Sequence, residues 1–202
     1  MNTIQNFIRY NDSFINPTTN SIKGILLHSS CKGIPSTKYL IKKYNNKFVP
    51  ESYHGFIDWR TGEYYNTLPY EYSAKHGGDY INQNYIGIMI CEPDYLNYTN
   101  DFSFDINEKF IDNVIESANV TYQTAINIFA ELCVVYSLNP LEDEVILSHS
   151  EATELGIIST SKYDPEHFWN GLDLNYDMDQ FRQNVNNIIL SGKIKYIPLK
   201  DL

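Results

Sequence analysis

Two histidines in this sequence stand at the ends of short apolar runs, and an aspartate follows the second of them. His28 follows residues 21–27 and His149 lies at the end of the run 144–147; both runs read as strands. Because strand ends are rigid supports for working side chains, these imidazoles and the Asp164 carboxylate could bind one metal ion. Zinc in hydrolases takes three ligands of these types and leaves a fourth position for water. The residue types are therefore those of a hydrolytic zinc site.

Each of these residues also has an ordinary structural reading. A lone histidine is more often a hydrogen-bonded structural residue, and the sequence contains no HExxH or CxxC motif. Residues 164–166 read as a helix start, with Asp164 as the N-cap and proline as the first helical residue. His167 could compete as a ligand one helical turn later, and Cys31, three residues after His28, could contact a metal. The residues alone leave both readings open.

The hydrophobic pattern predicts the elements that must position these side chains. Strands are expected at 21–27, 52–59, 63–67, 85–91 and 144–147. Helices are expected at 36–47 and 179–190, and the chain reads as helical from 107, with a clear 3.6-residue period over 121–137. Loops are expected at 74–78 and between His149 and Asp164. The run 85–91 is the most apolar and should be the central strand. Strands interleaved with helices predict a mixed α/β fold with a single mixed central sheet flanked by helices.

Length and composition fit one soluble domain. The chain has 202 residues, of which 43% are hydrophobic and 20% charged, and we expect a catalytic domain over 1–190 and a tail or linker over 191–202. A net charge of −10 argues against a nucleic-acid partner, and no apolar run is long enough to span a membrane. The N-terminus lacks the pattern of a secretory signal, and the scattered cysteines indicate free thiols in a reducing compartment.

Six segments, taken in order, resemble the type 2 N-acetylmuramoyl-L-alanine amidases, the zinc amidase and peptidoglycan recognition protein family. They are GILLHSS (24–30), SYH (52–54), AKHGG (74–78), IGIMICEP (86–93), LSHSEA (147–152) and KYDPEHFW (162–169). The resemblance covers residues 21–190, and its last two segments are similar to endolysins of clostridial type. It implies a zinc amidase fold.

The resemblance also implies a reaction and roles for particular residues. The reaction is zinc-dependent hydrolysis of the amide between N-acetylmuramic acid and L-alanine in bacterial peptidoglycan. His28, His149 and Asp164 match the zinc (Zn2+) ligands of the family. Lys162 matches a lysine that stabilises the oxyanion, and Tyr53 resembles a tyrosine that assists catalysis in phage members.

The sequence departs from the family pattern in the central strand. Many members carry a glutamate there as general base, and Met89 stands at the matching position. Glu92 is a stand-in, although strand alternation would point it to the opposite face, so Tyr53 is the preferred acid–base residue. His76 matches a loop histidine near the substrate groove and is expected to contact substrate, whereas His54 should face away from Tyr53.

The leading reading is a phage endolysin that stays in the cytoplasm until lysis and then acts on the bacterial cell wall. A non-catalytic peptidoglycan-binding module of the same fold is the alternative, motivated by Met89. A third reading is a hydrolase with a structural zinc and Cys91 as nucleophile. The oligomeric state does not follow from the sequence.

Overall fold

The computed structural model describes residues 3–100, 102–159 and 164–192. Within these residues the main sheet has six strands in the order β1-β4-β3-β5-β2-β8. Their bounds in that order are Thr3–Gln5, Tyr64–Asn66, Gly55–Ile57, Tyr85–Pro93, Gly24–Ile34 and Ile146–Ser148. Only β3 and β4 pair antiparallel, and the other neighbours are parallel. The predicted fold class, one mixed central sheet flanked by helices, is confirmed.

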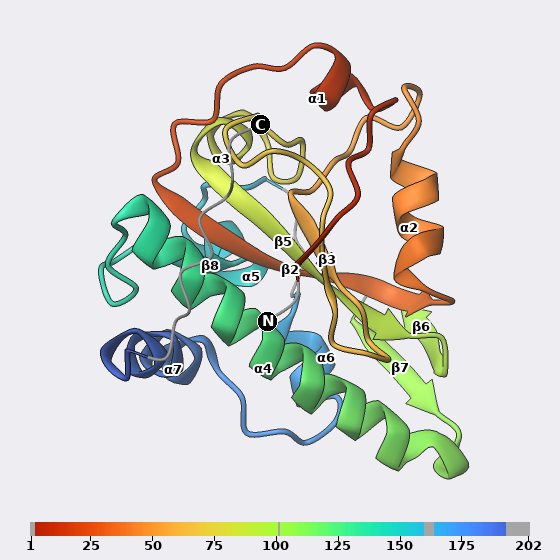
Figure 1. Cartoon of the computed structure of the whole chain (residues 1–202). Coiled ribbons are helices and arrows are strands. Elements are labelled where there is room, and N and C mark those ends of the chain that lie inside the picture. Colours follow the sequence, from red (N-terminus) through yellow and green to blue (C-terminus); the bar gives the residue numbers. More distant parts are fainter. Residues whose placement is uncertain (1–2, 101, 160–163, 193–202) are drawn as a thin grey trace.

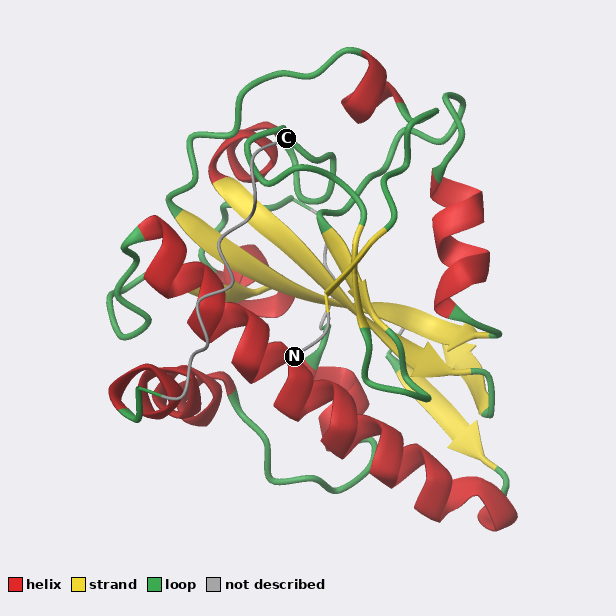
Figure 2. Cartoon of the chain, viewed as in Figure 1, coloured by secondary structure: helices red, strands yellow, loops and turns green. Residues whose placement is uncertain are grey.

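Helices lie on both sides of this sheet, as Figures 1 and 2 show. They are α1 (Asp12–Ile15), α2 (Thr37–Tyr44), α3 (Asp79–Asn84), α4 (Ile111–Tyr136), α5 (His149–Glu154), α6 (Glu166–Asn170) and α7 (Met178–Leu190), with a short 3-10 turn at Glu108–Phe110 before α4. The long α4 and the terminal α7 lie on one side and α2 on the other. A separate antiparallel hairpin, β6 (Leu96–Asn100) and β7 (Ser103–Ile106), extends from the end of β5.

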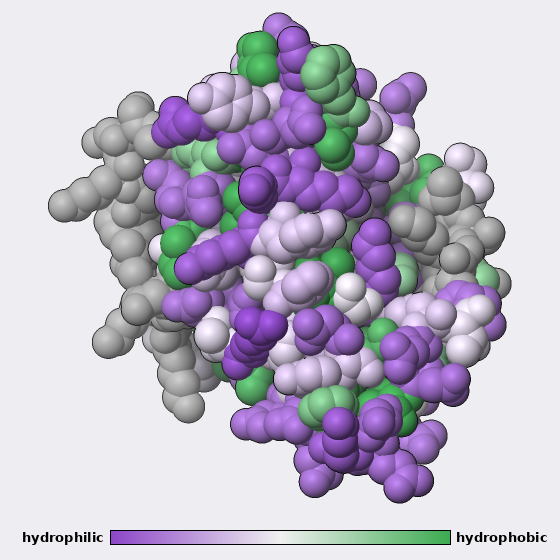
Figure 3. Space-filling view, turned by 90° about the vertical axis from the view of Figure 1, so that its right-hand side faces the viewer, coloured by the Kyte–Doolittle hydropathy of each residue, from purple (hydrophilic) through white to green (hydrophobic). Residues whose placement is uncertain are grey.

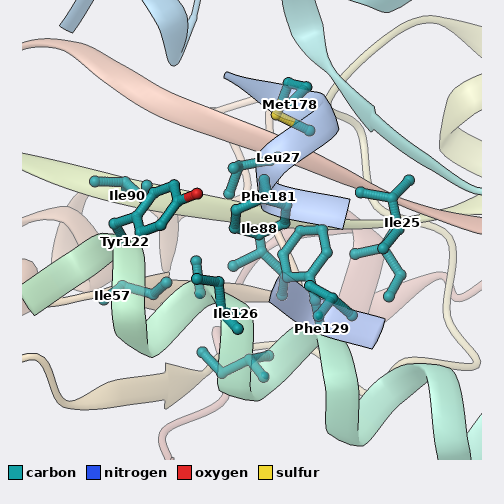
Figure 4. Close-up of a cluster of buried hydrophobic side chains, with 14 of the residues drawn as sticks. Ile25, Leu27, Ile57, Ile88, Ile90, Tyr122, Ile126, Phe129, Met178 and Phe181 are labelled. Carbon is teal, nitrogen blue, oxygen red and sulfur yellow. The ribbon is translucent and has the colours of Figure 1, made fainter. Parts of the chain in front are cut away.

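The main core lies between the sheet and the α4–α7 layer (Figure 4). Alternate residues of β5, namely Ile86, Ile88 and Ile90, point into it and are fully buried. From α4, Phe129 meets Phe181 of α7 edge-to-face with ring centroids 5.1 Å apart. Each such fully buried side chain contributes about 1.5–3 kcal/mol, so this layer holds the sheet rigid.

The opposite face of β5 carries a second cluster under α2. Met89 and Cys91 of β5 pack there with Phe56 of β3, and Leu40 and Tyr44 of α2 cover them. Every residue of β5 is buried, which confirms its predicted central position. The outer face of this side is mostly hydrophilic, with apolar side chains in small groups between the polar ones (Figure 3).

Several element boundaries differ from the sequence prediction. β2 continues past His28 to Ile34, because β5 pairs with it across an irregularity between Ser29 and Gly33. The stretch expected to be helical from 107 starts with the 3-10 turn and continues as α4 from Ile111, and a left-handed Ser137 ends the helix. The β6–β7 hairpin was not predicted, since its short polar strands lack a clear apolar alternation.

Candidate metal centre

His28 lies within β2 rather than at its end, so the prediction of a strand-end histidine is wrong for this residue. It pairs in register with Met89 of β5, which places both on the face opposite the main core. The imidazole is buried, with 1% exposure. Pairing on both sides of β2, with β5 and β8, fixes its backbone.

His149 is the first residue of α5, directly after β8. Ser148 closes β8 and caps the helix: its hydroxyl accepts the Glu151 amide hydrogen, and the Glu151 carboxylate accepts the Ser148 amide hydrogen. Leu27 of β2 and Ser148 of β8 are paired residues. The residues that follow them, His28 and His149, therefore lie side by side. The loop predicted directly after the strand is therefore a helix start, and it sets His149 beside His28.

Asp164 does not cap a helix, so that sequence prediction is wrong. α6 begins after Pro165 without a side-chain cap, and the Asp164 carboxylate turns inward. One oxygen, Oδ2, accepts the Ser29 amide hydrogen at 3.0 Å. The other, Oδ1, is buried and has no hydrogen-bond partner among the described residues. A buried anionic oxygen without a donor is the feature that a bound cation would complete.

The three predicted ligands converge. The Nδ1 atoms of His28 and His149 are 3.1 Å apart, and the Asp164 oxygens lie 3.4 Å from the first and 3.5 Å from the second. Tetrahedral zinc with bonds of about 2.0–2.1 Å places neighbouring ligand atoms roughly 3.3 Å apart. Of the described residues, only this buried group of three histidine and acidic side chains has metal-site spacing. Both the donor set and the separations fit zinc.

The charge of Asp164 suits this role. Burial by itself would raise the pKa of the carboxyl, but hydrogen bonding and attraction from His28, attraction from His149 and the Ser29 amide outweigh it and lower the pKa overall. Asp164 is therefore ionised at neutral pH inside a site that shields it from water.

His76 lies behind His28, not on an open groove wall. Its Nδ1 is 3.0 Å from His28 Nε2, and its Nε2 is 3.2 Å from the Tyr85 carbonyl oxygen. Burial, followed by the nearby His28, lowers the pKa of His76 well below its usual range, so the ring is neutral. His76 is only 6% exposed, so little of its side chain is open to a substrate. The substrate contact expected from the sequence stays a prediction.

His54 faces away from Tyr53, as expected. Its Nδ1 accepts the Gly87 amide hydrogen at 3.0 Å, and its Nε2 donates to the Tyr72 carbonyl at 2.8 Å. Burial lowers the pKa of His54 to about 4. It is a structural histidine with both ring nitrogens satisfied.

Tyr53 stands next to the three ligands. Its ring meets that of His28 edge-to-face at 5.2 Å, and Tyr44 packs on its other side at 5.6 Å. Burial, with smaller contributions from Tyr44 and Asp164, raises the pKa of Tyr53 well above its usual value. The phenol therefore keeps its proton at neutral pH and can donate it or a hydrogen bond.

Glu92 is on the other side of the sheet from Met89, as strand alternation predicted. It is fully buried, and its carboxylate accepts the Cys31 amide hydrogen and the Tyr98 hydroxyl. His167 of α6 completes the group, with Nε2 at 2.7 Å from the Tyr98 oxygen and 3.6 Å from Glu92. Glu92 and His167 are thus engaged with each other, and neither belongs to the group of three ligands.

The Glu92→Gln variant should reveal the cost of this burial. Burial raises the pKa of the Glu92 carboxyl from 4.5 to about 7. The folded protein therefore holds this proton more tightly than the unfolded chain does. The resulting contribution to stability is fully present below pH 4.5, and it is lost as the pH rises to 7. We expect the free energy of unfolding of wild type, relative to Glu92→Gln, to fall by about 3 kcal/mol over this interval.

Urea denaturation at several pH values measures this difference. The exposed Glu108→Gln is the control for loss of one negative charge. A wild-type minus Glu92→Gln difference that does not change with pH would contradict the assignment.

The remaining candidates are placed as follows. Lys162 lies outside the described residues. Cys31 is half-buried and is not among the three converging ligands. Cys91 is fully buried, accepts a hydrogen bond from the Thr37 hydroxyl, and has a pKa raised to about 12 by burial. A thiol of this kind is inert, which argues against the reading of Cys91 as nucleophile.

Supporting residues hold the ligand-bearing turn, and the sequence reading missed them. Arg182 of α7 binds both carboxylate oxygens of Glu151 at 2.9 and 3.0 Å and the Ile146 carbonyl at 3.0 Å. Glu166 of α6 accepts the Ser148 hydroxyl. These contacts fix the turn before His149 from two helices. The sequence SHSE (148–151) has the pattern of a capping box, but nothing in it indicates that Arg182 of α7 binds Glu151.

A comparison with family models adds an independent observation. The model described as N-acetylmuramoyl-L-alanine amidase matches residues 18–167, most of the chain. The chain belongs to the N-acetylmuramoyl-L-alanine amidase family. His28, His149 and Asp164 all lie inside this match, and the resemblance seen in the sequence is confirmed.

Solved structures of amidases and endolysins share the fold. The catalytic domain of XlyA superposes with a TM-score of 0.62 at 18% identity, covering 92% of this chain and 99% of that one. The Staphylococcus aureus hydrolase AmiA, solved with its ligand, gives 0.68 at 16%, covering 96% and 87%. A mutant endolysin from Bacillus subtilis gives 0.58 at 17%, covering 92% and 99%. No curated protein sequence matches the chain.

Proposed function

We propose that this amidase-family protein is a zinc-dependent peptidoglycan hydrolase that cleaves the amide between N-acetylmuramic acid and L-alanine. The observation that carries the proposal is the buried group of His28, His149 and Asp164: the two Nδ1 atoms are 3.1 Å apart, and the two carboxylate oxygens lie 3.4 Å from His28 Nδ1 and 3.5 Å from His149 Nδ1. Family membership supports the substrate and the bond. When bound, zinc would supply Lewis-acid chemistry, polarising a carbonyl and making water acidic enough to act as a nucleophile.

The protein's own residues would then hold the metal and move the proton. His28 and His149 offer ring nitrogens as ligands, and the ionised Asp164 offsets part of the metal's charge. Tyr53, protonated beside His28, would donate to the developing oxyanion or to the departing alanine amine. Lys162, which the resemblance assigns to the oxyanion, is kept in that role as a proposal.

We also propose that the protein acts as a phage endolysin on the bacterial wall, with residues 1–190 as its catalytic domain. The shared fold of endolysin structures supports this reading. In the described part of the chain, no helix has both the length and the apolar character to cross a membrane.

Wall digestion tests the proposal. Purified peptidoglycan incubated with the zinc-loaded protein should gain free alanine amines without new reducing sugar ends, and a chelator should stop the release. Excess zinc should restore it. The alternative, a non-catalytic peptidoglycan-binding module, is motivated by Met89 in place of an acidic residue. Wall binding without amine release in the presence of zinc would establish that alternative.

A further inference from the structure

A chain of two hydrogen bonds runs from the backbone of β5 to the face of His28. The Tyr85 carbonyl lies 3.2 Å from His76 Nε2, and His76 Nδ1 lies 3.0 Å from His28 Nε2. A carbonyl oxygen can only accept, so His76 Nε2 must carry its proton. With that proton on Nε2, the other nitrogen of the ring, Nδ1, is the one that can accept the proton of His28 Nε2.

Two acceptors compete for the proton of His28: His76 Nδ1 favours a proton on Nε2, and the Asp164 carboxylate, 3.4 Å from Nδ1, favours a proton on Nδ1 as long as no metal ion lies between them. If His28 carried its proton on Nδ1, two lone pairs would face each other at 3.0 Å. With the proton on Nε2, His28 donates to His76, and its own Nδ1 presents a lone pair toward His149 and Asp164. A neutral imidazole has one donor and one acceptor, so a metal ion on Nδ1 requires the proton on Nε2, which is the proton that His76 accepts.

The position of the His76 ring is itself built into the fold. Gly87 of β5 lies directly against it: a Cβ there would be 2.6 Å from His76 Nδ1 and 2.7 Å from two ring carbons. Asn82 of α3 accepts the amide hydrogens of His76 and Gly77 at 2.7 and 3.0 Å. The central strand therefore needs glycine at position 87 so that the ring can lie flat on it.

We propose that His76 is a positioning residue, which uses the Tyr85 carbonyl and the Gly87 gap to stabilise the Nε2-protonated tautomer of His28, the tautomer whose Nδ1 can bind a metal. This inference rests on the proposed zinc site. It gives His76 a role through His28, distinct from the substrate contact expected from the sequence. Outer partners of this kind typically contribute 10–100-fold to metal affinity.

Nitrogen-15 NMR of the histidine rings and zinc titration against a chromophoric chelator test the proposal. In the metal-free state, His28 should show a larger share of the Nε2-protonated form in wild type than in His76→Leu, where only the Asp164 carboxylate attracts the proton. His76→Leu removes the acceptor, so His28 should lose that tautomer preference and zinc affinity should fall roughly 10–100-fold. His76→Asn keeps an acceptor oxygen near the same place and should retain most of the affinity and the tautomer.

Two further variants separate positioning from general destabilisation. Trp59→Leu removes a ring that is as buried as that of His76 and whose Nε1 donates to the Ile34 carbonyl, and it should lower the melting temperature while leaving zinc affinity close to wild type. Gly87→Ala keeps His76 but displaces its ring, so it should reproduce the affinity loss of His76→Leu.

The outcomes are distinguishable. Equal affinity loss in the two leucine variants, or an unchanged His28 tautomer in His76→Leu, would overturn the inference. A wild-type protein that takes up no zinc would instead overturn the proposed function, and the tautomer of metal-free His28 would still decide the role of His76.

Discussion

The Asp164→Asn variant is expected to lose amidase activity by roughly 10³-fold or more, because it removes the only anionic ligand of the proposed zinc. A bound metal contributes several kcal/mol to the transition state, and about 4 kcal/mol corresponds to that factor. The amide is isosteric and can still accept the Ser29 amide hydrogen, so the fold should survive. A neutral amide oxygen is a poor zinc ligand, and zinc affinity should fall together with activity.

Two measurements check this prediction: the rate of amine release from purified wall, and zinc affinity by chelator competition. Asp58→Asn is the matched control, since Asp58 is a buried aspartate that accepts the Arg60 and Thr61 amide hydrogens in a distant turn. It should lose stability but keep its zinc. Wild-type zinc affinity in Asp164→Asn would refute the ligand assignment.

The Tyr53→Phe variant should lower kcat by about 10²–10⁴-fold, the usual contribution of a positioned proton donor. Its ring would still pack against His28 and Tyr44, so the protein should fold and bind zinc as wild type does. Only the hydroxyl, which makes no hydrogen bond to the described residues, is removed. The separation of kcat from zinc affinity is the signature of a catalytic group.

Steady-state rates on soluble wall fragments, with zinc content measured on the same samples, test this. Tyr44→Phe is the control, because it removes the hydroxyl of the neighbouring buried ring. If Tyr53→Phe hydrolyses the fragments at the wild-type rate, Tyr53 is not the proton donor and another group must protonate the departing amine.

The candidate ligand set came from the family resemblance, since residue types and spacing alone left a structural reading of each residue open. His28, His149 and Asp164 were identified without knowing that β2 and β8 are neighbours. Strand order supplied that fact, and strand order depends on packing between distant segments, which one sequence does not reveal.

The local rules failed where tertiary contacts outweighed them. The run 164–166 is a good helix start by propensity, yet the Asp164 carboxylate is drawn to the Ser29 amide and the two histidines. Residues 29–33 are poor strand formers, yet pairing with β5 extends β2 through them. The Glu92–Tyr98 contact was unpredictable because Tyr98 lies on a hairpin with no clear sequence signal.

The bidentate grip of Arg182 on Glu151 has a practical meaning for anyone shortening this protein. The family match stops at residue 167, and Arg182 lies beyond it. A fragment cut at that limit would free the turn that presents His149 and strip Phe181 from the underside of α4. Expression boundaries should therefore run past Leu190, because α7 holds in place the turn that carries His149.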